Sequence, residues 1–185
     1  MHKSKSKIFL IEGPDCSGKS TLVDSLLKVD KSINYYKENL IYRDRLMPEY
    51  SGIDHYRREA LNLSTQKNKS FVLDRFHIGE FVNPIIRKDG RNPLSFADLD
   101  HINTILSYNH TVILITCIAS DAFNEKVFKE RGEDVAKLED FKYLKFLYSL
   151  AHNEIKLQNK FFYNPEDYIG RPSHFFDFNV GRWVY

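Results

Sequence analysis

Two spacings of apolar residues alternate along this chain, and polar or turn-forming residues separate them. An unbroken apolar run of about four to eight residues is typical of a strand buried on both faces. Apolar residues three or four positions apart are typical of a helix with one buried side. These patterns predict strands over residues 8–11, 33–38, 70–75, 111–118 and 175–180. They predict helices from residue 22, over 53–66, from 95 or 96 to 108, over 121–130 and from about 138 to 159.

The alternation of strands and helices predicts an α/β protein with a doubly wound, mainly parallel sheet of about five strands flanked by helices. The run over 111–118 is the most apolar and is expected to be a central strand. A further helix is expected within 76–86, either broken by Asn83-Pro84 or beginning after it. With 185 residues, the chain fits one domain over 1–185.

The charge and cysteine content indicate which partners and which compartment to expect. The chain has 27 Lys and Arg and 25 Asp and Glu, interspersed, with a formal net charge of +2. This balance favours neither nucleic acid nor a membrane as partner. The apolar runs are shorter than a membrane span or a signal-peptide core, and two cysteines, Cys16 and Cys117, are too few for a disulfide framework. We therefore expect a cytoplasmic protein.

The first strand leads into the pattern Gly-x-x-x-x-Gly-Lys-Ser at residues 13–20, and a helix follows. This strand, loop and helix context is that of a phosphate-binding P-loop. Its glycines let successive N–H groups point at a phosphate, and the helix N-terminus adds partial positive charge. Lys19 is expected to reach the β and γ phosphates of ATP, and the Ser20 hydroxyl to ligate Mg²⁺. The residues expected to bind ATP are Gly13, Asp15, Cys16, Ser17, Gly18, Lys19, Ser20 and Thr21.

A second charged motif, Asp74-Arg75, ends the apolar strand over 70–75. Ligands of open α/β sheets gather at the carboxyl ends of strands, so both side chains should face the P-loop. Asp74 is suited to the Mg²⁺ shell, and Arg75 offers a donor fork for a second phosphate. An ordinary surface ion pair is the alternative. The Asn-Lys-x-Asp motif of GTPases is incomplete at Asn68-Lys69, which lacks the Asp, and this leaves the small-molecule kinases.

Three segments resemble one particular family of small-molecule kinases. Residues 11–21 resemble the thymidylate kinase form of the P-loop, with Glu-Gly, a variable residue and Asp. Asp74-Arg75-Phe76 resembles that family's Asp-Arg-Tyr/His signature, and residues 129–134 resemble its arginine-bearing lid, here expected over about 121–137. The similarity spans residues 8 to about 160.

This resemblance implies a nucleoside monophosphate kinase that uses ATP and Mg²⁺, with dTMP converted to dTDP, and a homodimer. It implies that Asp15 holds the sugar 3′-hydroxyl, that Arg75 clamps the acceptor phosphate, and that Arg131 swings in with the lid. Cys16 stands where some members carry an arginine, so the resemblance implies the variant in which the lid supplies the cation, from Arg131 and with it Lys126 and Lys129. The catalytic set is then Lys19, Asp74, Arg75 and Arg131. The substrate-binding set adds Asp15, Glu38, Tyr56, Arg57, Phe76 and Glu80.

Two other interpretations remain open. A deoxynucleoside kinase phosphorylates a neutral hydroxyl and needs a carboxylate base near the end of the second strand, where Glu38 stands. A regulatory module would hold ATP without transferring phosphate. An intact set of Lys19, Ser20, Asp74 and Arg75 argues against that module.

Overall fold

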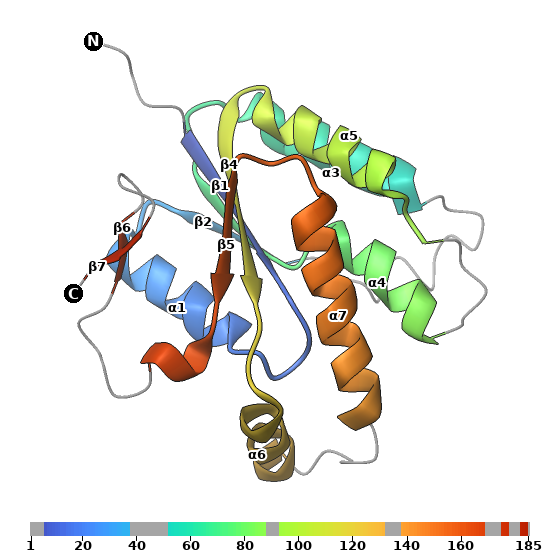
Figure 1. Ribbon diagram of the computed structural model, residues 1–185. Helices are drawn as coiled ribbons and strands as arrows, with labels where there is room; N and C mark the ends of the chain where they lie inside the picture. The colour runs from blue at the N-terminus through green and yellow to red at the C-terminus, as the bar shows by residue number, and fades with distance from the viewer. Residues whose placement is uncertain are drawn as a thin grey trace.

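A five-stranded parallel sheet in the order β2-β3-β1-β4-β5 forms the centre of the molecule (Figure 1). This computed structural model describes residues 6–37, 52–87, 93–131, 138–168, 175–177 and 182–184. The strands are β1 (Ser6–Glu12), β2 (Asn34–Lys37), β3 (Phe71–Asp74), β4 (His110–Cys117) and β5 (Asn159–Tyr163). The doubly wound α/β prediction is confirmed, with β1 in the middle and β4 as an interior strand beside it.

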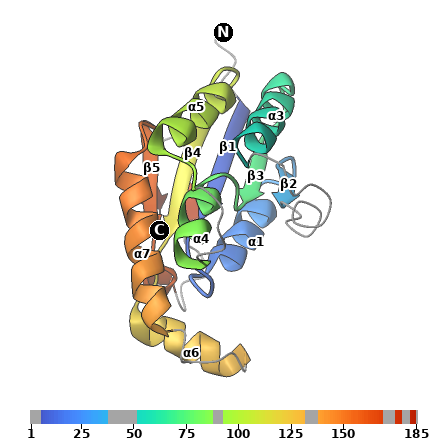
Figure 2. The ribbon, with the colours of Figure 1, turned by 90° about the vertical axis from the view of Figure 1, so that its right-hand side faces the viewer.

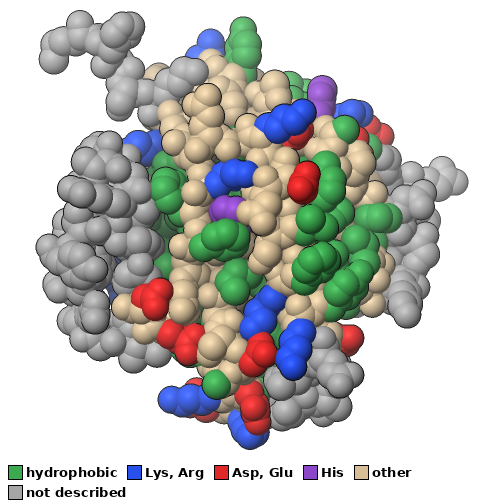
Figure 3. All heavy atoms as spheres, in the orientation of Figure 1, with side chains coloured by type: hydrophobic (Ala, Val, Ile, Leu, Met, Phe, Trp, Pro, Cys, Tyr) green, Lys and Arg blue, Asp and Glu red, His purple; other side chains and the backbone are tan. Residues whose placement is uncertain are grey.

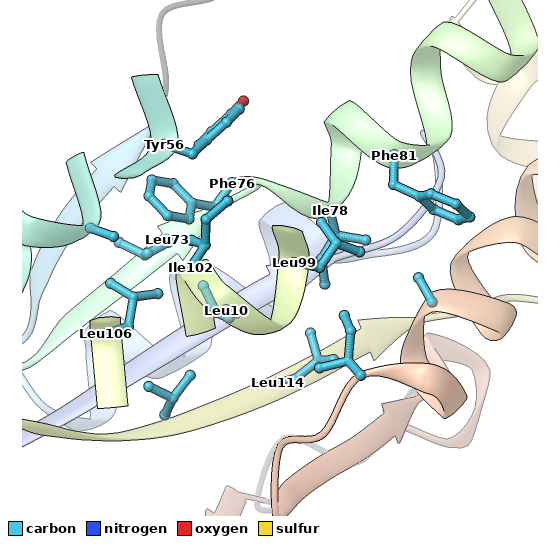
Figure 4. Close-up of a cluster of buried hydrophobic side chains, with 14 of the residues drawn as sticks. Leu10, Tyr56, Leu73, Phe76, Ile78, Phe81, Leu99, Ile102, Leu106 and Leu114 are labelled. Atoms are coloured by element: carbon cyan, nitrogen blue, oxygen red, sulfur yellow. The ribbon is translucent and has the colours of Figure 1, made fainter. Parts of the chain in front are cut away.

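Alternate side chains of the inner strands enter two separate cores, because successive residues of a strand point to opposite faces. Phe9 and Ile11 pack under α1 (Lys19–Val29) on one face. Ile8 and Leu10 belong to a larger cluster on the other face, which Figure 4 shows with side chains from β1, β3, β4 and the covering helices. Those helices are α3 (Gly52–Thr65), α4 (Ile78–Arg87), α5 (Phe96–Ser107) and α7 (Leu138–Glu154).

The predicted elements agree with the structure over most of the chain. Strands β1 to β4 and helices α1, α3, α5 and α6 (Asp121–Arg131) lie within a few residues of the expected ranges. The start of α5 is fixed by a reciprocal cap, in which the Asp98 amide donates to Ser95 Oγ at 3.2 Å and the Ser95 amide donates to Asp98 Oδ2 at 3.0 Å.

Helix α4 corrects the expectation that Asn83-Pro84 breaks or delays a helix. The helix runs from Ile78 to Arg87 with Pro84 inside it. A proline lacks the N–H that would bond to the carbonyl four residues earlier, here Glu80. The Leu94 amide donates to the Glu80 oxygen at 3.2 Å instead. A contact from outside the helix thus satisfies the carbonyl that Pro84 leaves open.

The fifth strand of the sheet corrects a second expectation. The helix predicted to reach residue 159 ends at Glu154, and residues 159–163 form β5 beside β4. Lys160 Nζ donates to the carbonyls of His152, Asn153 and Ile155 at 2.7, 3.0 and 2.8 Å, so a residue of β5 caps the helix end. The predicted strand over 175–180 contributes β6 (Phe175–Asp177), which pairs with β7 (Arg182–Val184) in a separate antiparallel pair.

Helix α6 lies beyond the carboxyl end of the sheet (Figure 2). Its outer surface carries ion pairs one helical turn apart, Lys129–Glu125 at 2.6 Å and Lys126–Glu130 at 3.9 Å. In Figure 3 charges of both signs gather at this end of the molecule. Among the helices that the structure describes, none has the length and apolar character needed to cross a membrane.

Candidate active site

The P-loop connects β1 to α1 and depends on three left-handed backbone positions. Gly13 has φ of +138° and Gly18 has φ of +83°. A Cβ at residue 13 would lie 2.3 Å from the Cys117 carbonyl oxygen, so only glycine fits against β4 there. Cys16 is left-handed as well, with φ of +56°, although it carries a side chain. The loop is therefore held in a defined, partly strained shape before any ligand is considered.

The Cys16 side chain links this loop to the helices beyond it. It is buried in a small cluster with Phe128 of α6 and Phe141 of α7, whose rings meet edge to face with centroids 4.7 Å apart. Contact with these rings helps to offset the cost of the left-handed backbone at residue 16. The same cluster fixes α6, which carries Arg131, against the P-loop.

Lys19 begins α1, and its side chain is 6% exposed. Its ammonium group donates to the Pro14 carbonyl, which also accepts from Ser17 Oγ at 2.8 Å. Burial, and then the charge of Arg75, lower the pKa of Lys19 to about 8, with Asp15 acting in the opposite direction. A pKa of about 8 leaves Lys19 mostly cationic near pH 7, as a phosphate ligand requires.

Arg75 and Asp15 meet across the mouth of the loop. The Arg75 guanidinium donates to the Asp15 carboxylate in a direct ion pair. Burial alone would raise the pKa of Asp15, but the positive charges of Arg75, Lys19 and Arg131 outweigh burial and lower this pKa. Asp15 therefore stays ionised, and the structure brings together four of the residues singled out in the sequence: Asp15, Lys19, Arg75 and Arg131.

Asp74 ends β3 and faces β2. Its Oδ2 accepts from the Tyr35 hydroxyl at 3.1 Å and lies 3.4 Å from Lys37 Nζ. Burial, and then the nearby Asp74 charge, raise the pKa of Tyr35 to about 12, so Tyr35 remains a hydrogen-bond donor. Parallel pairing places Lys37 opposite Asp74 at the ends of neighbouring strands.

Glu12, the last residue of β1, is fully buried. Its Oε1 accepts from the Phe76 amide at 2.8 Å. Burial raises the pKa of Glu12 to about 7, although the Phe76 amide and the charges of Arg75 and Lys19 act to lower it. Glu12 thus lies behind the loop and close to both cations.

A pocket of about 360 Å³ lies between the P-loop, Asp74 and Arg75 at the carboxyl end of the sheet. Four cations from different elements face it: Lys19, Lys37, Arg75 and Arg131. Loop residues from Asp15 to Thr21, including Ser17 and Gly18, and the Asp74 carboxylate complete the lining. Such a concentration of positive charge around a glycine loop suits a ligand with several phosphate groups.

The oxygen atoms of the pocket suit Mg²⁺. The Ser20 hydroxyl and the Asp74 carboxylate both line it. Within the described ranges no three His, Cys, Asp or Glu side chains cluster as a metal site. Magnesium ordinarily takes one or two protein oxygens and completes its shell with phosphate and water, so Ser20 and Asp74 fit this ion in the presence of a nucleotide.

Other candidates from the sequence lie away from the pocket. The Tyr56 ring is 1% exposed and meets Phe76 edge to face at 5.0 Å, which places both rings in the core. Arg57 pairs with Asp54 at 3.8 Å on α3, and Glu80 is buried in α4. Glu38 and the lid residues after Arg131 fall outside the described residues.

Three functional candidates were absent from the sequence prediction: Glu12, Tyr35 and Lys37. The sequence feature that could have pointed to Glu12 is a charged residue at the end of an apolar strand. A carboxylate buried there needs a specific partner. The feature that could have pointed to Lys37 is a cation at the end of a predicted strand.

Solved structures that share this fold include a nucleotide-bound protein and two kinases. The YorR protein of Bacillus subtilis, in complex with phosphorylated GDP, has a TM-score of 0.67 and 19% identity over 86% of each chain. Polyphosphate kinase 2 from Arthrobacter aurescens TC1 has a TM-score of 0.66 and 11% identity, over 88% of this chain and 61% of that one. Deoxyadenosine kinase from M. mycoides with bound dCTP has a TM-score of 0.51 and 17% identity over 94% of each chain.

The sequence itself matches no protein-family model and no curated protein. At these low identities the structural likeness establishes the fold alone, a five-stranded parallel α/β sheet flanked by helices.

Proposed function

We propose that this protein is an ATP-dependent nucleoside monophosphate kinase with Mg²⁺ as cofactor and dTMP as its acceptor. The observation that carries the proposal is the Arg75–Asp15 pair beside Lys19 at the pocket. Lys19 and the P-loop amides account for the phosphates of the donor. Arg75 then supplies a second cation, with a planar fork suited to a second phosphate group. A kinase of monophosphates has to bind two phosphate-bearing substrates side by side.

Each residue of the pocket has a separate role in the proposed reaction. An oxygen of the acceptor phosphate attacks the γ-phosphorus of ATP, the bond from that phosphorus to the β–γ bridging oxygen breaks, and ADP leaves. The acceptor oxygen is already anionic, so the step requires no general base. Lys19, Arg75 and Arg131 offset the charge that develops on the transferred group, and Asp15 orients the acceptor through its sugar hydroxyl. Magnesium held by Ser20 and Asp74 would neutralise donor phosphate charge.

A deoxynucleoside kinase is the second candidate. It is favoured by the structural likeness to a deoxyadenosine kinase over 94% of both chains. That reaction needs a base for a neutral hydroxyl, a role proposed for Glu38. Under this alternative Arg75 would serve the donor phosphates instead of an acceptor phosphate.

A coupled assay of ADP release separates the candidates. Mg-ATP is combined in turn with dTMP, dUMP, dCMP, dGMP, dAMP, AMP, thymidine and deoxycytidine. We expect turnover with dTMP and none with the nucleosides, and we expect Arg75→Ala to lower kcat/KM for the monophosphate roughly 100-fold or more. Calorimetry should show Mg-ATP binding to Arg75→Ala within about threefold of wild type.

The control is Lys156→Ala, which removes a cation at the opposite end of the sheet, where the side chain is 87% exposed. It should leave every rate unchanged. Turnover with nucleosides alone would instead support the deoxynucleoside kinase, and equal loss of ATP and monophosphate binding in Arg75→Ala would overturn the role given to Arg75.

A further inference from the structure

Glu12 occupies a position that is costly for a carboxylate. It is fully buried at the end of β1, between apolar strand residues and Gly13. Burying an ionisable group is strongly unfavourable unless a specific partner compensates. Its Oε1 accepts from the Phe76 amide at 2.8 Å, and the nearby amide of Ile78 also favours the ionised carboxylate. The other oxygen, Oε2, has no hydrogen-bond partner within the described part of the chain. The bond from the Phe76 amide to Oε1 is therefore the closest contact that favours a glutamate here.

The amide that Glu12 holds belongs to an unusual turn. Arg75 directly follows β3 and has φ of +67°, the left-handed region. This conformation is unfavourable for an L-residue, so the chain adopts it only where its surroundings impose it. The Arg75 amide donates to the Ile11 carbonyl at 3.0 Å, and the Phe76 amide donates to Glu12. Two consecutive residues of β1 thus fix the two peptide units on either side of Arg75.

This restraint determines where the Arg75 side chain points. With both flanking peptides fixed, the guanidinium reaches Asp15 and lines the phosphate pocket. If the turn relaxed to an extended conformation, the Cα–Cβ bond of Arg75 would rotate away from its present direction. A displacement of about 1 Å in a substrate-positioning group is enough to cost roughly 100-fold in rate.

We infer that Glu12 is a positioning residue, whose carboxylate holds the left-handed turn that aims Arg75 at the acceptor phosphate. This inference rests on the proposed function for the identity of that phosphate. Glu12 touches neither substrate nor reacting atom in this scheme, and it acts through the Phe76 amide and the Arg75 backbone.

Two variants separate this role from a merely structural one. Glu12→Ala removes the acceptor of the Phe76 amide, whereas Glu12→Gln keeps an oxygen in its place. We expect Glu12→Ala to raise KM for the acceptor monophosphate roughly 10- to 100-fold, with KM for ATP within about threefold. Glu12→Gln should restore the acceptor KM to within about threefold of wild type. Loss of acceptor and ATP affinity by equal factors would overturn the inference.

A double-mutant cycle tests the route through Arg75. In an Arg75→Ala background, Glu12→Ala should lower kcat/KM by less than about twofold, because the group it positions is gone. The full loss in that background would show that Glu12 acts elsewhere. Thr116→Ser is the matched control, since Thr116 is the buried residue paired with Glu12 across β1 and β4, and serine keeps the hydroxyl that lies 2.8 Å from His152 Nδ1. It disturbs the same layer of the sheet and should leave acceptor KM unchanged.

Hydrogen exchange of the Phe76 amide tests the geometry without any substrate. This amide should exchange slowly in the wild type and in Glu12→Gln, and at least roughly tenfold faster in Glu12→Ala, with the β1 amides unchanged. Rapid exchange in the wild-type protein would overturn the inference even if the alanine variant does not fold.

Failure of the proposed function is recognised separately. If the wild-type enzyme phosphorylates no nucleotide, calorimetry of inorganic phosphate binding to protein saturated with Mg-ADP replaces kinetics, because the donor site is then filled and the site at Arg75 is left. Glu12→Ala should then weaken phosphate binding as much as Arg75→Ala does, and the double variant should bind no more weakly. Additive losses would contradict the positioning role, whatever the true substrate.

Discussion

At the scale of single residues, the burial of Glu12 lowers the free energy of unfolding near neutral pH, while its carboxylate holds the turn at Arg75. Its pKa is raised from 4.5 to about 7, above all by burial. Between about pH 4.5 and pH 7 the folded protein therefore binds more protons than the unfolded chain, and the contribution of Glu12 to the free energy of unfolding falls as pH rises. Above pH 7 an ionised carboxylate is kept inside the protein at a cost.

Glu12→Gln should remove this pH dependence. Relative to wild type, we expect the free energy of unfolding of the variant to rise by roughly 3 kcal/mol between pH 4.5 and pH 8, from a shift of two to three pKa units at about 1.4 kcal/mol each. Urea unfolding of both proteins across this interval measures the difference. Parallel pH profiles for the two proteins would mean that the pKa of Glu12 is not raised.

The residues of the site also show how far sequence reasoning reaches. Asp15, Lys19, Asp74 and Arg75 were predictable because each stands at a fixed offset in a motif at a strand end. The burial of Glu12 and the Asp74–Lys37 contact depend on which strands become neighbours. Tyr56 lies in the core, and its spacing in the sequence could not show this, because helical spacing marks an apolar side without saying whether it faces core or ligand.

At the scale of elements, the predictions failed where a distant segment supplies the deciding contact. Pro84 stays inside α4 because Leu94, ten residues later, bonds the open carbonyl of Glu80. Helix α7 ends where Lys160 binds its last carbonyls, although apolar residues continue at helical spacing to residue 157. β5 is a strand because β4 offers it a parallel edge. None of these partners is visible in a local window of sequence.

Helix α6 offers a prediction at the same scale. It is joined to the P-loop through Phe128, which contacts Cys16 and Phe141 in one buried cluster. Phe128→Ala should loosen α6 and withdraw Arg131 from the pocket, lowering kcat roughly tenfold, with ATP affinity within about threefold.

The control is Phe162→Ala, because Phe162 is half exposed on β5 and stacks on His152 away from the P-loop. It should leave kcat unchanged. If Phe128→Ala lowers kcat equally in an Arg131→Ala background, the cluster does not act through Arg131.

At the scale of the whole molecule, parallel topology is what makes the site. The P-loop follows β1, Lys37 ends β2, and Asp74 and Arg75 lie at the end of β3. Because these strands run in one direction, all of these residues reach the same edge of the sheet. A ligand in the pocket therefore connects three strands and α1, and its binding free energy adds to the stability of the fold as a whole.

Thermal unfolding should resolve the two halves of this pocket. At about 100 times its dissociation constant, Mg-ATP should stabilise the wild type by about 2.7 kcal/mol, which for a chain of this length is a rise in Tm of roughly 5–10 °C. dTMP should add a second rise in Tm.

Lys19→Ala should lose most of the rise with Mg-ATP, and Arg75→Ala should keep the rise with Mg-ATP and lose the rise with dTMP. Chelation of Mg²⁺ should reduce the rise with ATP and spare that with dTMP, since Ser20 and Asp74 serve the donor. If Arg75→Ala abolishes both rises, the guanidinium belongs to the donor phosphates, and the second phosphate site assigned to Arg75 does not exist.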